Sequence, residues 1–259
     1  MANPSKKAIS KAVKDKNVII TGASSGIGER TAYLLSECGA HVILLARTED
    51  KLKAVKDSIE ELGGKATYYP CDLTNMDDIE KVSAQILADF GHVDVLVNNA
   101  GVALTRKAEE ITEDERDQVL DLDLKSVFLC SQRAGLRMIR QQGGKIINTA
   151  SIMGQVGQKL TLSYCAAKAG VLGLTRALAL EWAQYNIQVN ALCPGFVLTA
   201  INETMMQDEK ILRATLRKTP AGRLGQVSDL TGAALYLASD ASNFMTGQTL
   251  TVDGGWTAQ

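Results

Sequence analysis

The sequence predicts an α/β protein with a single Rossmann-type, doubly wound parallel sheet of about seven strands and helices on both faces. Three observations lead to this fold. Short apolar runs alternate with longer amphipathic stretches along the chain, which is typical of parallel strands connected by helices. A glycine-rich turn joins the first apolar run to the first amphipathic stretch. The chain has 259 residues and is 46% hydrophobic, which suits one domain with a large core.

Seven apolar runs are expected to be strands, because a strand covered on both faces is apolar throughout. They span residues 17–21, 41–46, 66–71, 94–99, 145–150, 188–193 and 249–254. The stretches between them predict helices over residues 26–38, 48–62, 76–90, 114–141, 163–184 and 226–238. Since no repeat or Pro/Ser-rich linker divides the chain, residues 1–259 are predicted to form one domain.

Two segments depart from this alternation. Residues 1–15 are rich in lysine and lack the apolar core of a secretory signal, so we expect a short N-terminal extension. Residues 198–222 follow the sixth strand and contain one helical run, MMQDEKILRATLRK. A long insertion at the carboxyl end of a strand is either a substrate-covering segment or an ordinary surface helix, and the sequence leaves both open.

Composition argues against several classes of function. The formal net charge of −1 provides no field that would attract nucleic acid, and the longest apolar runs are too short to span a bilayer. Five dispersed cysteines without a Cys-x-x-Cys pair indicate reduced thiols in a cytoplasmic protein. The two histidines, His41 and His92, have no second ligand nearby, so neither a metal site nor a Ser-His-Asp triad is expected.

The first predicted strand ends in the turn TGASSGIG, which contains Gly22, Gly26 and Gly28. Glycines at such a turn let backbone amides approach a pyrophosphate, which the N-terminus of the following helix also favours. The spacing Gly-x-x-x-Gly-x-Gly differs from the commoner Gly-x-Gly-x-x-Gly. Its position between a strand and a helix predicts dinucleotide binding.

The end of the second predicted strand favours NADP over NAD, although NAD stays possible. An NAD site is expected to place an acidic residue here for the ribose 2′-hydroxyl. This chain has Ala46 and then Arg47, whose guanidinium is able to bind a 2′-phosphate. The alternative is that Arg47 is a surface residue that pairs with Glu49 or Asp50.

Ser151, Tyr164 and Lys168 are the candidate catalytic residues. Tyr164 and Lys168 stand four apart in a stretch that favours helix, so their side chains are expected to share one face. A lysine cation beside a phenol favours the phenolate, which allows proton transfer near neutral pH. Ser151 follows a predicted strand and could hold a substrate oxygen next to that phenol.

These motifs, taken together, resemble those of the short-chain dehydrogenase/reductase family in order and spacing. They are TGASSGIG, Asp72 in CDLT, NNAG at 98–101, the Ser151–Tyr164–Lys168 set and PGFVLT at 194–199. The resemblance runs from about residue 16 to the VDGG at 252–255. It implies hydride transfer between a nicotinamide cofactor and a carbonyl or secondary alcohol.

The resemblance also implies individual roles. Tyr164 would be the general acid/base, Ser151 would hold the reacting oxygen, and Lys168 would bind the nicotinamide ribose and lower the pKa of the phenol. Cofactor contacts are implied for Gly22, Ser24, Ser25, Gly26, Ile27 and Gly28 at the pyrophosphate, Asp72 and Leu73 at the adenine, Asn99, Ala100 and Gly101 near the adenine-side ribose, and Pro194, Gly195, Val197 and Thr199 at the nicotinamide. Simpler roles exist for some of them: Asp72 as a cap and Asn99 as a strand end.

One position departs from the family pattern. The stretch VLDLDLKSVF places Asp123 where the family usually has Asn, which contributes to the proton relay from the lysine. Asp keeps an acceptor but loses two amide donors. If it is ionised near Lys168, it would partly offset that cation and raise the pKa of Tyr164. We expect Asp123 to retain the relay through its backbone carbonyl.

The chain is most similar to 3-oxoacyl-carrier-protein reductases and gluconate-type dehydrogenases, which leaves the substrate open between an acyl ketone and a polyol or sugar acid. A non-catalytic, cofactor-binding regulator is a further alternative, opposed by the intact Ser-Tyr-Lys set. Candidate substrate contacts are Ser151, Met153, Gln155, Gln158 and Met205. The resemblance implies a homotetramer, or a homodimer, that pairs helices 114–141 and 163–184.

Overall fold

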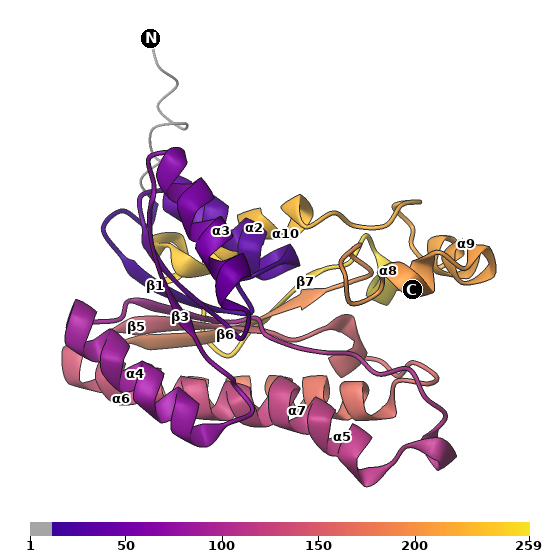
Figure 1. Cartoon of the computed structure of the whole chain (residues 1–259). Helices are drawn as coiled ribbons and strands as arrows, with labels where there is room; N and C mark the ends of the chain where they lie inside the picture. Colours follow the sequence, from indigo (N-terminus) through magenta and orange to yellow (C-terminus); the bar gives the residue numbers. More distant parts are fainter. Residues whose placement is uncertain (1–11) are drawn as a thin grey trace.

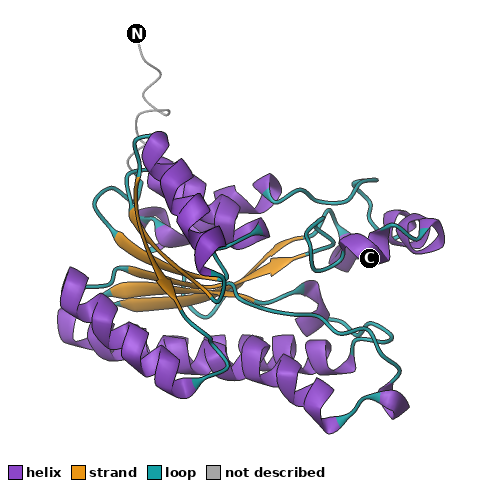
Figure 2. Ribbon diagram, in the orientation of Figure 1, coloured by secondary structure: helices purple, strands orange, loops and turns teal. Residues whose placement is uncertain are grey.

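The computed structural model describes residues 12–259 and contains one parallel sheet with helices on both faces (Figures 1 and 2). The order across the sheet is β3-β2-β1-β4-β5-β6-β7. The strands are β1 (Asn17–Thr21), β2 (His41–Ala46), β3 (Lys65–Pro70), β4 (Val95–Asn98), β5 (Gly144–Thr149), β6 (Ile187–Pro194) and β7 (Thr249–Val252). The predicted fold class is therefore confirmed, and β1 and β4 meet at the point where the strand order reverses direction.

Two sets of helices cover the sheet. One face packs against α2 (Gly26–Glu37), α3 (Glu49–Glu61) and α10 (Ser228–Ala238). The other packs against α4 (Met76–Phe90), α6 (Ser126–Gln141) and α7 (Leu162–Trp182). Neighbouring strand residues point to opposite faces, so Val18 and Ile20 belong to the first core and Ile19 to the second.

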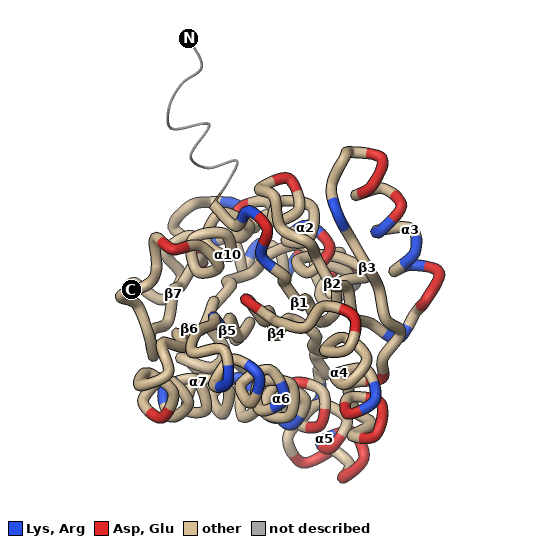
Figure 3. Tube along the Cα trace, turned by 90° about the vertical axis from the view of Figure 1, so that its left-hand side faces the viewer, with Lys and Arg blue, Asp and Glu red and all other residues tan. Residues whose placement is uncertain are grey.

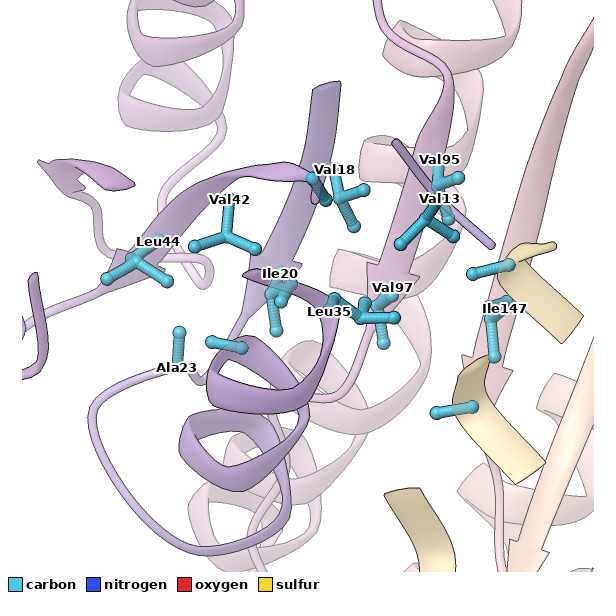
Figure 4. Packing of buried hydrophobic residues seen from close by; sticks show 14 of the residues in the cluster. Val13, Val18, Ile20, Ala23, Leu35, Val42, Leu44, Val95, Val97 and Ile147 are labelled. Carbon is cyan, nitrogen blue, oxygen red and sulfur yellow. The ribbon is translucent and has the colours of Figure 1, made fainter. Parts of the chain in front are cut away.

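The first core shows how much of the N-terminal segment belongs to the domain. Val13 is fully buried and packs with Val18, Val95 and other strand residues (Figure 4). The backbone amide of Asp15 donates to the carbonyl of Gly39 at 2.9 Å. Residues 12–15 of the predicted extension are thus part of the packed structure, and its residues 1–11 lie outside the described residues.

The predicted helix 114–141 is interrupted, which is a correction to the sequence prediction. It consists of α5 (Glu113–Leu120), a π-helical turn (Asp121–Lys125) and α6. π-turns add one residue to a helical turn and often occur at functional sites. Here the turn carries Asp123, whose buried side chain points at Lys168. A single added residue shifts the helical pattern by one position only, which is too little for the sequence pattern to reveal it.

The insertion at 198–222 also forms two helices where one run was predicted. They are α8 (Glu203–Met206) and α9 (Glu209–Arg217). Asp208 separates them, because its side chain accepts hydrogen bonds from the backbone amides of Lys210 and Ile211 at 2.8 and 3.2 Å. This is an N-cap, which starts a new helix.

The surface carries both signs of charge. Figure 3 shows Lys and Arg interspersed with Asp and Glu, for example along α3, where Lys53–Asp57 and Lys56–Glu60 are i,i+4 pairs. Within residues 12–259, no helix combines the length and the apolarity that crossing a membrane requires.

Candidate active site

A cleft of about 340 Å³ opens at the carboxyl ends of the strands, on both sides of the junction between β1 and β4. Ligands of open parallel sheets bind at this position. The cleft gathers segments that are far apart in the chain. Its lining includes Gly22, Ser24, Ser25, Gly26, Ile27, Arg47, Asp72, Leu73, Asn99, Ala100, Gly101, Asp123, Ser151, Tyr164, Lys168, Pro194, Gly195, Val197 and Thr199.

The glycine turn has the geometry that a bound phosphate requires. Gly22 and Gly26 have φ angles of +65° and +62°, which residues other than glycine rarely adopt. Ser25, the N-cap of α2, makes no capping hydrogen bond with its side chain. The amides of the first turn of α2 therefore remain free to bind an anion, and the turn fits a pyrophosphate.

Gly28, whose predicted contact with the pyrophosphate stays a prediction, lies beneath the turn. It does not line the cleft. A Cβ at this position would lie 2.4 Å from the carbonyl oxygen of Gly22 and 2.5 Å from the amide nitrogen of Asn99. Gly28 therefore permits close packing beneath the turn.

Asn99 and Thr21 join the two central strands below the cleft. The Asn99 side chain donates to the carbonyls of Thr21 and Gly22 at 3.1 and 3.4 Å. In return, Thr21 Oγ1 accepts from the backbone amides of Asn99 and Ala100 at 2.9 and 3.0 Å. These four bonds fix the glycine turn relative to the end of β4. The sequence prediction missed Thr21, because a threonine at the end of a strand carries no distinctive signal.

Arg47 and Asp72 lie at the end of the cleft where the adenosine of a dinucleotide is expected. Arg47 is exposed and forms no ion pair with Glu49 or Asp50, which was the alternative role for it. Asp72 accepts hydrogen bonds from the backbone amide and the hydroxyl of Thr74 at 3.0 and 2.8 Å. These bonds lower the pKa of Asp72, and the charge of Arg47 acts in the same direction. Asp72 is thus both a turn-stabilising residue and part of the cleft wall.

Ser151, Tyr164 and Lys168 come together at the other end. Lys168 is 3% exposed, and its Nζ lies 5.5 Å from the centroid of the Tyr164 ring. Nζ also donates to the carbonyl of Thr149 at 3.1 Å. Ser151 is the extended residue before a short 3-10 turn, Ile152–Gly154, and its Oγ accepts from the amide of Met153 at 3.1 Å. Proton donors and acceptors therefore converge on one buried corner of the cleft.

Asp123 completes this corner with its side chain. Its Oδ2 lies 3.0 Å from Lys168 Nζ, without the alignment of a hydrogen bond, and both side chains are almost completely buried. Its Oδ1 accepts from the amide of Val102 at 2.7 Å. Both oxygens thus face donors, an arrangement that suits the ionised carboxylate. Gly101 is required beside them, since a Cβ there would lie 2.9 Å from Asp123 Oδ2. The expected relay through the Asp123 carbonyl stays a prediction.

The electrostatic balance in this corner raises the pKa of Tyr164 above its ordinary value. Burial is the main cause, since it disfavours the phenolate. Lys168 and Ser151 lower the pKa, as predicted for Lys168, whereas Asp123 raises it. Burial alone would lower the pKa of Lys168, but the Asp123 carboxylate and Tyr164 outweigh that effect and raise it. Burial raises the pKa of Asp123, against the opposing effects of Lys168 and the Val102 amide.

Four predicted substrate contacts do not line the cleft. Met153 is buried, Met205 is half-buried in α8, and Gln158 is exposed. The side-chain amide of Gln155 donates to Thr251 Oγ1 in β7 at 2.9 Å. Beyond Thr199, the cleft is lined by Ala200, Ile201 and Asn202. The sequence pattern could not show this, because residues of an irregular segment have no periodicity that assigns them to a face.

Comparisons with known proteins agree with this geometry. A family model described as enoyl-(acyl carrier protein) reductase matches residues 22–257. The chain belongs to the short-chain dehydrogenase/reductase family. This family membership confirms the resemblance that the sequence motifs indicated. The chain is an oxidoreductase of this family and interconverts an alcohol and a carbonyl with a nicotinamide cofactor.

Relatives within the family act on different substrates. The chain is 40% identical over 246 residues to an NAD-dependent glycerol dehydrogenase of Listeria innocua, covering 95% of each protein. It is 37% identical to a 3-oxoacyl-acyl-carrier-protein reductase of Thermotoga maritima, covering 94% of this chain and 98% of that one. A solved gluconate 5-dehydrogenase of Burkholderia cenocepacia, in complex with NADP and tartrate, superimposes with a TM-score of 0.94 at 34% identity, over 97% of this chain and 99% of that one.

Proposed function

We propose that Tyr164 is the general acid/base of this oxidoreductase, that Ser151 holds the reacting oxygen, and that Lys168 orients the cofactor ribose and favours the phenolate. The observation that carries this proposal is the ammonium of Lys168 at 5.5 Å from the Tyr164 ring, within a buried corner of the cleft. When bound, the nicotinamide supplies or accepts the hydride. In reduction, Tyr164 donates its proton to the developing alkoxide, and in oxidation it accepts a proton from the alcohol.

The cofactor we propose is NADP, with NAD as the alternative. The open amides of the α2 N-terminus and the glycine turn suit the pyrophosphate. Arg47 is exposed at the cleft and forms no ion pair with an acidic residue of the next helix. The position after Ala46 carries no carboxylate, so nothing there repels a 2′-phosphate. NADP is bound in the gluconate 5-dehydrogenase structure, whereas the glycerol dehydrogenase is NAD-dependent, so both cofactors occur among relatives.

The substrate we propose is a ketone or 3-oxoacyl compound with an apolar portion. Large apolar side chains are exposed on the two segments beside the catalytic corner. They are Val156, Leu160, Leu162, Leu198 and Ile201. Such a surface favours an alkyl or acyl group over a fully hydroxylated chain. A sugar acid or polyol is the second candidate, because the glycerol and gluconate dehydrogenases are among the similar proteins.

We further propose that the protein is cytoplasmic and forms a homotetramer, with a homodimer as the alternative. Each chain would act as one catalytic domain, and residues 198–222 would be its substrate segment. The outer face of α7 supports the assembly. Ala166, Ala169, Gly173, Ala177 and Leu180 are all exposed and recur at helical spacing. An exposed apolar stripe of this kind suits pairing with another helix. The single sheet from 17 to 252 supports one domain, and the five free cysteines suit a reducing compartment.

The test combines binding with turnover. Purified wild-type protein is titrated with NADPH and NADH by cofactor fluorescence, and then assayed with ketones, 3-oxoacyl thioesters and sugar acids. The Tyr164→Phe variant should bind NADPH like wild type and lose about 10²–10⁴-fold in turnover, because it lacks the transferable proton. Binding of neither nucleotide, or full activity in Tyr164→Phe, would refute the proposed function.

A further inference from the structure

The segment 198–222 has little core of its own. Among its described side chains, those that are buried are Met206 in α8, Thr215 in α9 and Thr219, and α8 is only four residues long. A helix with so little buried surface opens easily unless other contacts hold it. Contacts at the two ends of the segment are therefore needed to hold it in place.

The base of the segment is closed by backbone hydrogen bonds. The amide of Leu198 donates to the carbonyl of Gly225 at 3.0 Å, and the amide of Gly225 donates to the carbonyl of Phe196 at 2.8 Å. The chain therefore leaves the sheet and returns at the same point. These bonds fix the base but do not reach α9.

The C-terminal residues 253–259 are anchored beside that base. Asp253 accepts from the backbone amides of Gly255 and Thr257 at 2.9 and 2.8 Å, and from the Thr257 hydroxyl at 2.7 Å. The amide of Gly195 donates to the carbonyl of Val252 at 2.9 Å. The C-terminal residues are thus tied to the loop after β6, which carries the predicted nicotinamide contacts.

Trp256 connects this anchored end to the residues just before the segment and to the end of α9. Its ring centroid lies 4.8 Å from that of Phe196, which precedes the segment. Lys218, the C-cap of α9, places its Nζ 5.5 Å from the centroid of the Trp256 ring. Gln259 adds a hydrogen bond to the carbonyl of Lys218 at 2.7 Å. Figure 1 shows the C-terminus beside α8 and α9, at the right of the molecule.

We propose that Trp256 is a positioning residue for the substrate side of the cleft: it holds the end of α9 against the loop after β6. This inference rests on one part of the proposed function, namely that residues 198–222 cover the substrate. Aromatic pairs and cation–π contacts each contribute enough that losing both should raise the ratio of open to closed segment about tenfold. Because substrate binds the closed segment, it should bind more weakly as the closed fraction falls, while chemistry in the closed state is unchanged.

The experiment uses Trp256→Ala, with Trp182→Phe as the control, since Trp182 is the other tryptophan and packs over Gly135, away from the segment. Trypsin cleaves after Lys and Arg, and α9 carries Lys210, Arg213 and Arg217. Trp256→Ala should be cut within α9 faster than wild type, by up to about tenfold, as mapped by mass spectrometry, because the local opening equilibrium has changed. Trp182→Phe should be cut there at the wild-type rate.

Kinetics supply the second result. In Trp256→Ala, the rise in KM for the carbonyl substrate multiplied by the rise in cleavage rate should be about ten, with kcat and the NADPH Kd within about twofold of wild type, since only the opening equilibrium has changed. Unchanged cleavage within α9, cleavage spread over the whole chain, or a fall in kcat at constant KM would overturn the proposal. If Trp256→Ala fails to fold, Trp256→Phe and Lys218→Met replace it in the same cleavage assay. Each should then be cut within α9 faster than wild type. An inactive wild-type protein would refute the proposed function and leave the cleavage result to decide the role of Trp256.

Discussion

Replacing Asp123 by Asn should move the pH dependence of catalysis to lower pH. Asp123 Oδ2 lies 3.0 Å from Lys168 Nζ, which lies 5.5 Å from the centroid of the Tyr164 ring. The carboxylate oxygen is therefore at most about 8.5 Å from the centre of the phenol ring. At an effective dielectric constant of about 20, a unit charge at that distance contributes about 2 kcal/mol, or about 1.4 pH units. Its removal stabilises the phenolate.

The sign is the same in both directions of the reaction. In oxidation, Tyr164 must be deprotonated, so the rising limb of kcat/KM against pH should shift down by about one unit or more in Asp123→Asn. In reduction, Tyr164 must be protonated, so the falling limb should shift down as well. Asn retains an oxygen that can accept from the Val102 amide, which favours an intact fold.

The assay is the profile of kcat/KM from pH 5 to 11 for wild type, Asp123→Asn and the control Asp121→Asn. Asp121 lies in the same π-helical turn but forms an exposed pair with Lys125 at 3.1 Å. The control should leave the profile unchanged. A profile that stays in place in Asp123→Asn, moves to higher pH, or moves equally in the control would refute the electrostatic role of this side chain.

Two further predictions concern other charged groups. Arg47→Ala should weaken NADPH binding about 10- to 100-fold and NADH binding by less than about twofold, because a charged hydrogen bond to the 2′-phosphate is lost. The control Lys51→Ala should change neither Kd. Equal losses of affinity for both nucleotides would contradict the role of Arg47. Lys145 is 5% exposed, donates to Gln188 and Ser242 but to no carboxylate among residues 12–259, and burial lowers its pKa from 10.5 to about 8. The unfolded chain binds more protons between these two values, so wild-type stability should rise with pH in this window, by an amount of about 2 kcal/mol. Urea unfolding at pH 7 and pH 10 should show that this gain is missing in Lys145→Met and present in Lys65→Met, whose lysine is exposed; the same gain in both variants would rule out Lys145 as its source.

Local patterns in the sequence determined most of the fold and predicted most of the residues that line the cleft. A strand needs a short apolar run and a buried helix face needs apolar residues at helical spacing, so the sequence indicates both without knowledge of distant contacts. Tyr164 and Lys168 lie one helical turn apart, and the glycines of the turn lie within seven residues, so their relation is also local. Observed strand ends differ from the predicted ones by two residues at most.

Contacts between distant segments were decided only by the tertiary structure. The pairing of Asp123 with Lys168, the bonds between Thr21 and Asn99, and the approach of Trp256 to Lys218 depend on which strands are neighbours and where each connection returns. The close approach of Gly28 to Gly22 depends equally on how α2 packs. Periodicity assigns a residue to a face of its own element, but it carries no information on which residue of another element will face it, because that is set by the packing of the whole sheet and its helices.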